Sequence, residues 1–135
     1  MKKQLLIIAV VLVGAFTLIS MNILTTNPQE PWKVPAKYEK MVNPLADAAD
    51  AEMVGRKLYA KHCKSCHGTK GKGDGAKADT VDTEIGDFTE DAFKSQSDGA
   101  LYYKTYIGRD DMPSFSKKIP GTDDQWKVIN YIKGL

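Results

Sequence analysis

The chain has 135 residues, which is enough for one small domain and not for two, and its hydrophobic content of 42% excludes a largely disordered protein. Its 19 Lys and Arg residues nearly balance 17 Asp and Glu residues, and leaving out Lys2 and Lys3 makes the two counts equal. This balance excludes a whole-chain attraction to nucleic acid, so no nucleic acid partner is expected.

The N-terminus has the pattern of a membrane anchor. Lys2 and Lys3 precede an apolar run from Leu5 to Leu24, which is long enough for a helix of about 30 Å, the thickness of a bilayer hydrocarbon core. We predict a single-pass transmembrane helix over residues 1–25, with everything after it on the outer, periplasmic side of the cytoplasmic membrane. A cleaved signal peptide is the alternative; it gives the same topology, but its apolar core is usually about 7–15 residues.

Residues 26–46 are predicted to form a linker. Prolines break helices and favour extended structure, and this stretch holds Pro28, Pro31, Pro35 and Pro44. Trp32 and Tyr38 suit either the membrane interface or packing on the following domain, and the sequence leaves both positions open.

The domain is predicted to span residues 47–135 and to begin with a helix. Acidic residues from Asp47 suit a first helical turn, and the apolar spacing carries the helix to about Lys61. A glycine-rich loop then covers residues 68–75, and an acidic, irregular segment covers residues 79–91, in which Phe88 is the aromatic residue expected to turn inward.

Two further helices complete the domain. Ser97 is the predicted N-cap of one helix, and Gly108 ends it. The residues from Thr122 to Gln125 match a capping box for the last helix, and Trp126 opens its buried side. The pattern is all-α, with no strand signal.

The segment Cys63-Lys64-Ser65-Cys66-His67 joins the first helix to the glycine-rich loop. Two thiols at this spacing can each add to one vinyl group of a haem, and the adjacent histidine then lies under the iron. We therefore predict one covalently attached haem c per chain, with Cys63 and Cys66 as thioether links and His67 as proximal iron ligand.

Three other uses of the cysteines fit less well. A thioredoxin-type pair expects a βαβ setting and leaves His67 unused. Zinc needs four ligands, and His62, Cys63, Cys66 and His67 are crowded into six positions. A disulfide across so short a gap would be a poor staple, because its entropic gain grows with loop length.

The iron of an electron carrier needs a ligand on its other face. His62 adjoins Cys63 and is held on the proximal side, so the methionines are the candidates. Met112 lies between the helix terminator Gly108 and Pro113, which restricts Met112 to an extended conformation, and it is the predicted distal ligand. Two such ligands leave no open position on the iron, which argues against an enzyme and against a gas sensor.

With these residues in place, the chain resembles class I c-type cytochromes over about residues 50–135. The resemblance rests on the haem motif, the glycine-rich loop, Met112-Pro113, Gly55-x-x-x-Tyr59 and Tyr131. It implies a small all-α cytochrome c domain of three or more helices around a covalent haem. It also implies that the first and last helices cross at Gly55, with Tyr59 and Tyr131 at the contact.

One departure concerns the orientation of His67. In the resembled family a carbonyl of the glycine-rich loop commonly orients the proximal histidine, and here Ala76 stands where related loops have proline. Which carbonyl receives His67 is left open.

The expected function is that of a single-electron carrier in a respiratory chain, with redox proteins, above all membrane respiratory complexes, as partners. The alternative is a haem-bearing subunit of a larger membrane oxidoreductase. The predicted contacts of the haem ring, which also suit ordinary core positions, are Phe88, Tyr102, Tyr106, Ile107 and Phe115. Seven basic residues surround the haem motif in the sequence, and we call them the basic collar: Arg56, Lys57, Lys61, Lys64, Lys70, Lys72 and Lys77. The collar either steers an acidic partner or is merely solvated.

Overall fold

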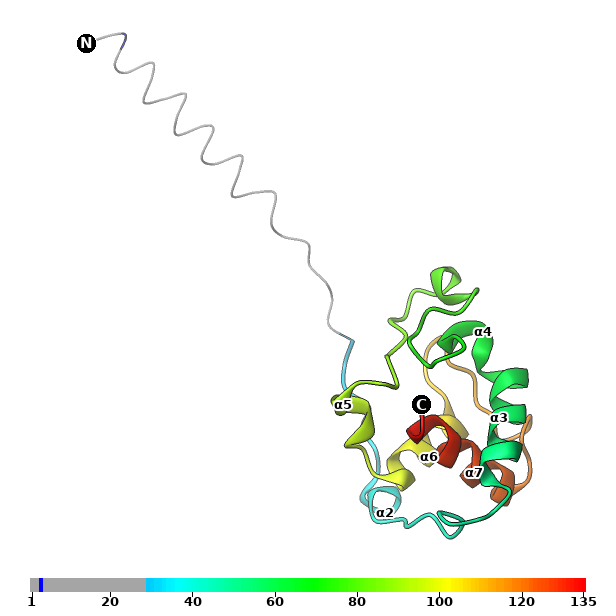
Figure 1. The fold of residues 1–135 in the computed structure, drawn as a ribbon. Helices are drawn as coiled ribbons and strands as arrows, with labels where there is room; N and C mark the ends of the chain where they lie inside the picture. The colour runs from blue at the N-terminus through cyan, green and yellow to red at the C-terminus, as the bar shows by residue number, and fades with distance from the viewer. Residues whose placement is uncertain (1–2, 4–28) are drawn as a thin grey trace.

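A computed structural model describes Lys3 and residues 29–135, so the rest of the predicted anchor over residues 1–25 lies outside the described residues (Figure 1). The described part is all-α, as predicted, and no helix in it is both long and apolar enough to cross a membrane. In chain order the elements are α2 (Ala36–Glu39), α3 (Ala51–His62), α4 (Lys64–His67), the 3-10 turn η2 (Ala78–Thr80), α5 (Asp91–Lys94), α6 (Asp98–Ile107) and α7 (Thr122–Lys133).

The crossing of α3 and α7 forms the centre of the fold (Figure 1). Gly55 lies at the crossing, where an added Cβ would come within 2.7 Å of the Cβ of Tyr131, so only glycine allows the helices to approach this closely. The rings of Tyr59 and Tyr131 pack 5.2 Å apart, which confirms the expected contact. Ile129 of α7 has no exposed surface, and burial of such a side chain contributes roughly 1.5–3 kcal/mol.

The helix α3 starts later in the chain than Asp47, where the acidic residues predicted its first turn. Residues 47–50 form turns, and α3 begins at Ala51. Asp50 instead accepts a hydrogen bond of 2.7 Å from Lys127 of α7, which ties the start of α3 to the opposite helix.

Both ends of α6 lie where the sequence predicts them, whereas the start of α7 differs from its prediction. The Ser97 hydroxyl accepts a hydrogen bond from the Ala100 amide at 3.1 Å, and Gly108 ends α6 with a φ of 72°. The predicted capping box of α7 is wrong, because Gly121 is the N-cap residue and no side chain caps the helix. The side-chain nitrogen Nε2 of Gln125 donates instead to the Ile119 carbonyl at 2.6 Å, a contact that the capping-box spacing does not reveal.

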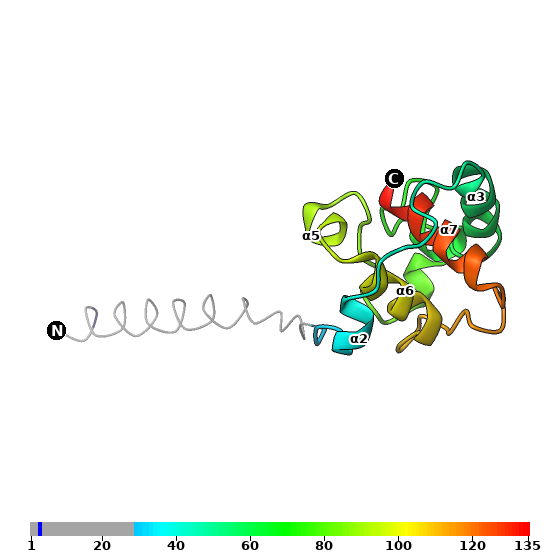
Figure 2. The same cartoon turned by 90° about the horizontal axis from the view of Figure 1, so that it is seen from below.

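The stretch predicted as a linker is packed on the domain from residue 29 onward. Its short helix α2 lies beside α6 (Figure 2), where the rings of Tyr38 and Tyr103 are 4.6 Å apart. Asn43 then donates to the Asn130 side chain of α7 at 2.5 Å. The described part of this stretch is therefore an extension of the domain surface.

Candidate haem site

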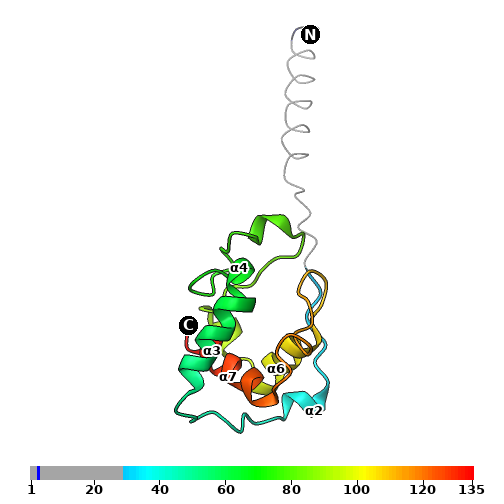
Figure 3. The ribbon, with the colours of Figure 1, turned by 90° about the vertical axis from the view of Figure 1, so that its right-hand side faces the viewer.

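In the ribbon, α4 lies across from α6 and from the segment that follows α6 (Figure 3). Residues of these elements line two adjoining cavities. Their volumes are about 480 Å³ and about 260 Å³. The cavities meet, because the same six residues line both: His67, Ile85, Phe88, Thr105, Met112 and Ile132. Together they make a mainly apolar space of the size that proteins use for small ligands and cofactors.

The haem motif sits at the smaller cavity. Cys63 follows α3, and both Cys66 and His67 belong to α4. The Cys63 carbonyl accepts hydrogen bonds from the amides of Cys66 and His67, at 3.1 Å and 3.0 Å, so one turn of backbone fixes all three side chains. Both cysteines line this cavity and carry free thiols.

The environment of Cys63 differs from that of a redox-active thiol. Burial, together with the neighbouring Cys66, raises the pKa of the Cys63 thiol to about 12. Catalytic cysteines of the thioredoxin type have a lowered pKa, because the thiolate is their reactive form. The thioredoxin alternative therefore lacks support in the geometry as well as in the fold.

His67 is held as a neutral imidazole. Its ring stacks on Phe88 with ring centres 4.4 Å apart, and burial lowers the pKa of His67 to about 4. Neutral imidazole is the form that binds iron. In the described part of the chain, the buried Nδ1 of His67 has no hydrogen-bond partner. The Gly68 carbonyl accepts a hydrogen bond from the Tyr59 hydroxyl at 2.6 Å, so that carbonyl is already engaged.

Met112 reaches both cavities from a tight turn after α6. The Arg109 amide donates to the Met112 carbonyl at 2.8 Å, and the Met112 amide donates back to the Arg109 carbonyl at 2.9 Å. Asp110 takes the left-handed conformation in between, with a φ of 52°. The structure thus brings the side chains of Cys63, Cys66, His67 and Met112 to one continuous space from two distant parts of the sequence.

Asp111 fastens another wall of the site, and sequence reasoning missed it. Its carboxylate accepts hydrogen bonds from the Thr83 amide at 3.0 Å, the Thr83 hydroxyl at 2.6 Å and the Asp82 amide at 3.1 Å. These bonds lower the pKa of Asp111 and hold the segment that carries Ile85 against the turn that carries Met112. An acidic pair in a polar loop gives no sequence signal for such a role.

The predicted ring contacts divide into two groups. Phe88, which is 9% exposed, and Phe115 line the cavities, as predicted. Tyr102 and Tyr106 line a separate shallow groove beside α2, and Ile107 is 45% exposed, so none of these three lines either cavity. The spacing of the aromatic residues along α6 allows this side of the helix to face either the haem or the rest of the core. The Trp126 ring stacks on the Tyr102 ring, and this packing turns Tyr102 and Tyr106 away from the cavities.

His62 also lines the smaller cavity, on the side of the cysteines. Its ring meets Phe115 edge-on with centres 6.2 Å apart, and its buried Nε2 has no partner among the described residues. Lys77 and Lys118 lie at the same cavity and place positive charge beside the haem motif.

The cavity fits a haem. It has two free thiols at one end, a buried neutral imidazole with an unpartnered nitrogen, a thioether on another segment and walls of aromatic and aliphatic side chains. The fold and the site together define a small all-α haem-attachment domain.

The family comparison agrees. Residues 52–135 match the family model described as Cytochrome c, and the chain belongs to the cytochrome c family. Haem-based electron transfer is the function of this domain, which is typically that of an electron carrier rather than an enzyme, and the Cys63 and Cys66 pair is consistent with one covalent haem c.

Among solved structures, the chain is similar to a chain of the reducing HAO-like protein complex of Kuenenia stuttgartiensis. The two are 26% identical with a TM-score of 0.56, and the match covers 78% of this chain and 51% of the other, so this chain aligns with about half of the other's length. No curated protein matches the chain.

Proposed function

We propose that the protein is a single-electron carrier of a respiratory chain, with Cys63 and Cys66 as the covalent haem links and His67 and Met112 as axial iron ligands. The observation that carries the proposal is that these four side chains, which lie up to 49 positions apart, line one continuous apolar space. When bound, haem c supplies an iron centre that accepts and releases one electron.

The residues of the chain explain why the iron would carry electrons and bind no substrate. His67 offers a neutral ring nitrogen, and the soft thioether of Met112 favours ferrous iron and so raises the reduction potential. Apolar walls formed by Ile85, Phe88 and Phe115 act in the same direction, because the ferric form carries one more positive charge and is disfavoured by burial.

The basic residues around the motif support a docking role. Lys77, a member of the basic collar, and Lys118 lie beside the cavity that holds the cysteines. We infer that an acidic redox partner approaches this end, because a positive rim speeds the association of such a partner at low salt. Electron-transfer rates that do not change with ionic strength would contradict this step.

The proposed location is the outer, periplasmic face of the cytoplasmic membrane, with residues 1–25 as transmembrane anchor. In support, the domain surface already begins at Gln29, so residues 26–28 alone would separate the anchor from the domain. A chain of this length spans about 10 Å. The haem domain would therefore stay near the bilayer, which suits membrane respiratory complexes as partners.

A haem-bearing subunit of a larger oxidoreductase is the second candidate. The similar chain of Kuenenia stuttgartiensis belongs to a protein complex, which favours this reading. Purification of the full chain in mild detergent separates the two: a monomer supports a free carrier, and stable co-purification with other chains supports a subunit.

The test of the proposal is an optical spectrum of the purified full chain with a pyridine haemochrome assay. We expect a c-type spectrum and, in the oxidised form, the near-infrared band of sulfur-to-iron charge transfer. Met112→Ala should remove the band, whereas Met53→Ala, which changes a residue that is 62% exposed on α3, should keep it. A band that survives Met112→Ala would contradict the assignment of the distal ligand.

A further inference from the structure

The segment that precedes α2 lines the outer end of the larger cavity. Gln29 and Trp32 line this cavity together with His67 and Met112, although they lie in the stretch predicted as a linker. We call residues 29–34 the strap. The strap is thus part of the wall of the haem site.

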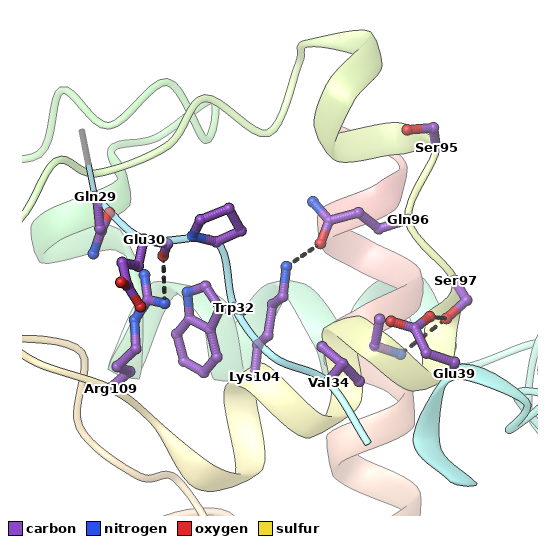
Figure 4. A pocket seen from close by; sticks show the side chains of 12 residues that line it. Gln29, Glu30, Trp32, Val34, Glu39, Ser95, Gln96, Ser97, Lys104 and Arg109 are labelled. Atoms are coloured by element: carbon purple, nitrogen blue, oxygen red, sulfur yellow. Dashed lines mark hydrogen bonds between the residues drawn. The ribbon is translucent and has the colours of Figure 1, made fainter. Parts of the chain in front are cut away.

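Arg109 clamps the strap in place (Figure 4). Its guanidinium group lies 4.5 Å from the centre of the Trp32 ring, and its Nη1 donates to the Glu30 carbonyl at 2.8 Å. Lys104 approaches the same ring at 5.9 Å while it bonds to the Gln96 side chain. A cation–π contact of this kind contributes about 0.5–1 kcal/mol at an exposed site and more where water is excluded.

The strap is also fixed at its other end. Beyond it, Glu39 of α2 accepts a hydrogen bond of 2.9 Å from the Ser97 hydroxyl at the start of α6 (Figure 4). Tyr38 packs on Tyr103, which lies further along α6, with ring centres 4.6 Å apart. The strap therefore runs between two attachments, and Arg109 provides the one at the cavity.

Arg109 belongs to the same turn as Met112, the predicted iron ligand. Its backbone pairs with that of Met112 through the two hydrogen bonds of the turn. The backbone thus sets the place of Met112. The side chain of Arg109 forms an ion pair with Asp110 through its Nε at 3.2 Å and holds the strap through its Nη1 and the face of its guanidinium group. One turn connects both walls of the site.

We propose that Arg109 is a positioning residue that holds Trp32 over the outer end of the haem cavity, which excludes water there and leaves the end beside Lys77 and Lys118 as the route for electron exchange. The inference rests on the haem ligation proposed above. Its physical basis is that a water-exposed haem edge stabilises the more highly charged ferric iron and lowers the reduction potential.

The first experiment measures reduction potentials of the full chain and of six variants, one of which is Arg109→Gln. Trp32→Ala removes the covering ring and keeps the positive charge of Arg109, and Arg109→Lys keeps the charge but loses the planar clamp. We expect both variants to have a lower reduction potential than the wild type. The double variant Trp32→Ala/Arg109→Lys should have a reduction potential no lower than that of Trp32→Ala. Trp32→Phe should retain most of the wild-type potential, and Val42→Ala, at a residue 84% exposed, is the control that should not change it.

Two results would overturn the proposal. If Arg109→Gln lowers the potential while Trp32→Ala and Arg109→Lys leave it unchanged, Arg109 acts through its charge alone. If Arg109→Lys abolishes the near-infrared band, its side chain holds Met112 rather than the strap. A band that is absent already in the wild-type protein contradicts the proposed ligation, and the second experiment then still tests the clamp.

The second experiment follows trypsin cleavage after Lys33, an exposed residue of the strap. Arg109→Gln loses one cation–π contact and one hydrogen bond, which changes an opening equilibrium by roughly tenfold, so cleavage there should be roughly tenfold faster. Trp32→Ala loses the cation–π contact but keeps the hydrogen bond from Arg109 to the Glu30 carbonyl, so its cleavage should be about two- to fivefold faster. Cleavage after Lys57, within α3, should keep its wild-type rate if the domain remains folded. Wild-type rates at Lys33 in both variants would overturn the clamp.

Discussion

The close crossing of α3 and α7 predicts that Gly55→Ala destabilises the domain. In an exposed helix interior, alanine is more stable than glycine by about 1 kcal/mol, so without tertiary contacts this substitution would stabilise the protein. At Gly55 the new methyl group would lie 2.7 Å from the Tyr131 Cβ and 3.0 Å from the Lys127 carbonyl carbon, and closer still to the Lys127 carbonyl oxygen.

The sign and size of the effect follow from what those atoms are. Backbone atoms and a Cβ cannot rotate out of the way, so the two helices must separate, and overpacking of this kind typically costs about 1–3 kcal/mol. Because the clash is with backbone atoms and a Cβ at 2.7–3.0 Å or less, we expect a cost at the upper end of this range, about 2–3 kcal/mol, which exceeds the gain in helix propensity by about 1–2 kcal/mol. For a domain of this size the melting temperature should fall by roughly 4–16 °C.

The assay is thermal and denaturant unfolding of the haem-loaded chain, followed by far-UV circular dichroism. Gly134→Ala is the matched control, because its added Cβ would meet its nearest neighbour at an ordinary 3.4 Å and the residue has a negative φ of −86°. The control should stay within about 0.5 kcal/mol of wild type. A Gly55→Ala variant as stable as the wild type, or more stable, would refute the argument that the helices cross too closely for a side chain.

Three further predictions concern the site and the pH dependence of stability. Gly108→Ala should lower the free energy of unfolding by about 1–3 kcal/mol and weaken the near-infrared band, because a Cβ at this φ of 72° would meet the Met112 carbonyl oxygen at 2.5 Å. Gly134→Ala, at a residue that lines neither cavity, is the control, and an unchanged band in Gly108→Ala would contradict the prediction. Tyr59→Phe should cost about 1–3 kcal/mol in denaturant unfolding, because it leaves the buried Gly68 carbonyl without its donor, and a loss no larger than that of Tyr103→Phe would count against it. The hydrogen bond from Lys127 lowers the pKa of Asp50 below its ordinary value of 3.8, so the pair stabilises the fold above that pH, and the stabilisation is lost as the pH falls through the lowered pKa. The difference in melting temperature between wild type and Asp50→Asn should therefore shrink from about pH 6 to about pH 3, and a constant difference would show that this pair does not set the pH dependence.

The chemistry of the site could be read from short stretches of sequence. The haem motif is contained in five consecutive residues, and Met112 is predicted as the distal ligand from its neighbours Gly108 and Pro113 and from the poor placement of the other methionines. The limits of α6 likewise depend on Ser97 and Gly108, whose capping geometry is decided within one turn of backbone. Local signals of this kind need no knowledge of the rest of the chain.

Other features depend on which segments meet in space. The prolines before residue 46 indicated an extended linker, yet from residue 29 this stretch packs on the domain, with Asn43 bonded to Asn130 and Trp32 bound to Arg109. The apparent capping box at Thr122 failed because the Gln125 side chain reached the Ile119 carbonyl instead. Each of these outcomes sets a local preference against a side-chain contact outside the local pattern, and that contact decided the structure.

The sequence by itself determined that the chain carries a haem-attachment motif, a methionine suited to iron and an all-α pattern, because these depend on covalent spacing and on helical periodicity. Only the tertiary structure decided that Asp111 fastens the wall that carries Ile85, that Tyr102 and Tyr106 turn away from the cavities and that the strap covers the larger cavity. The physical reason is that tertiary contacts join residues far apart in the chain, 77 positions between Trp32 and Arg109 and 87 between Asn43 and Asn130, and no local pattern encodes which of them will meet.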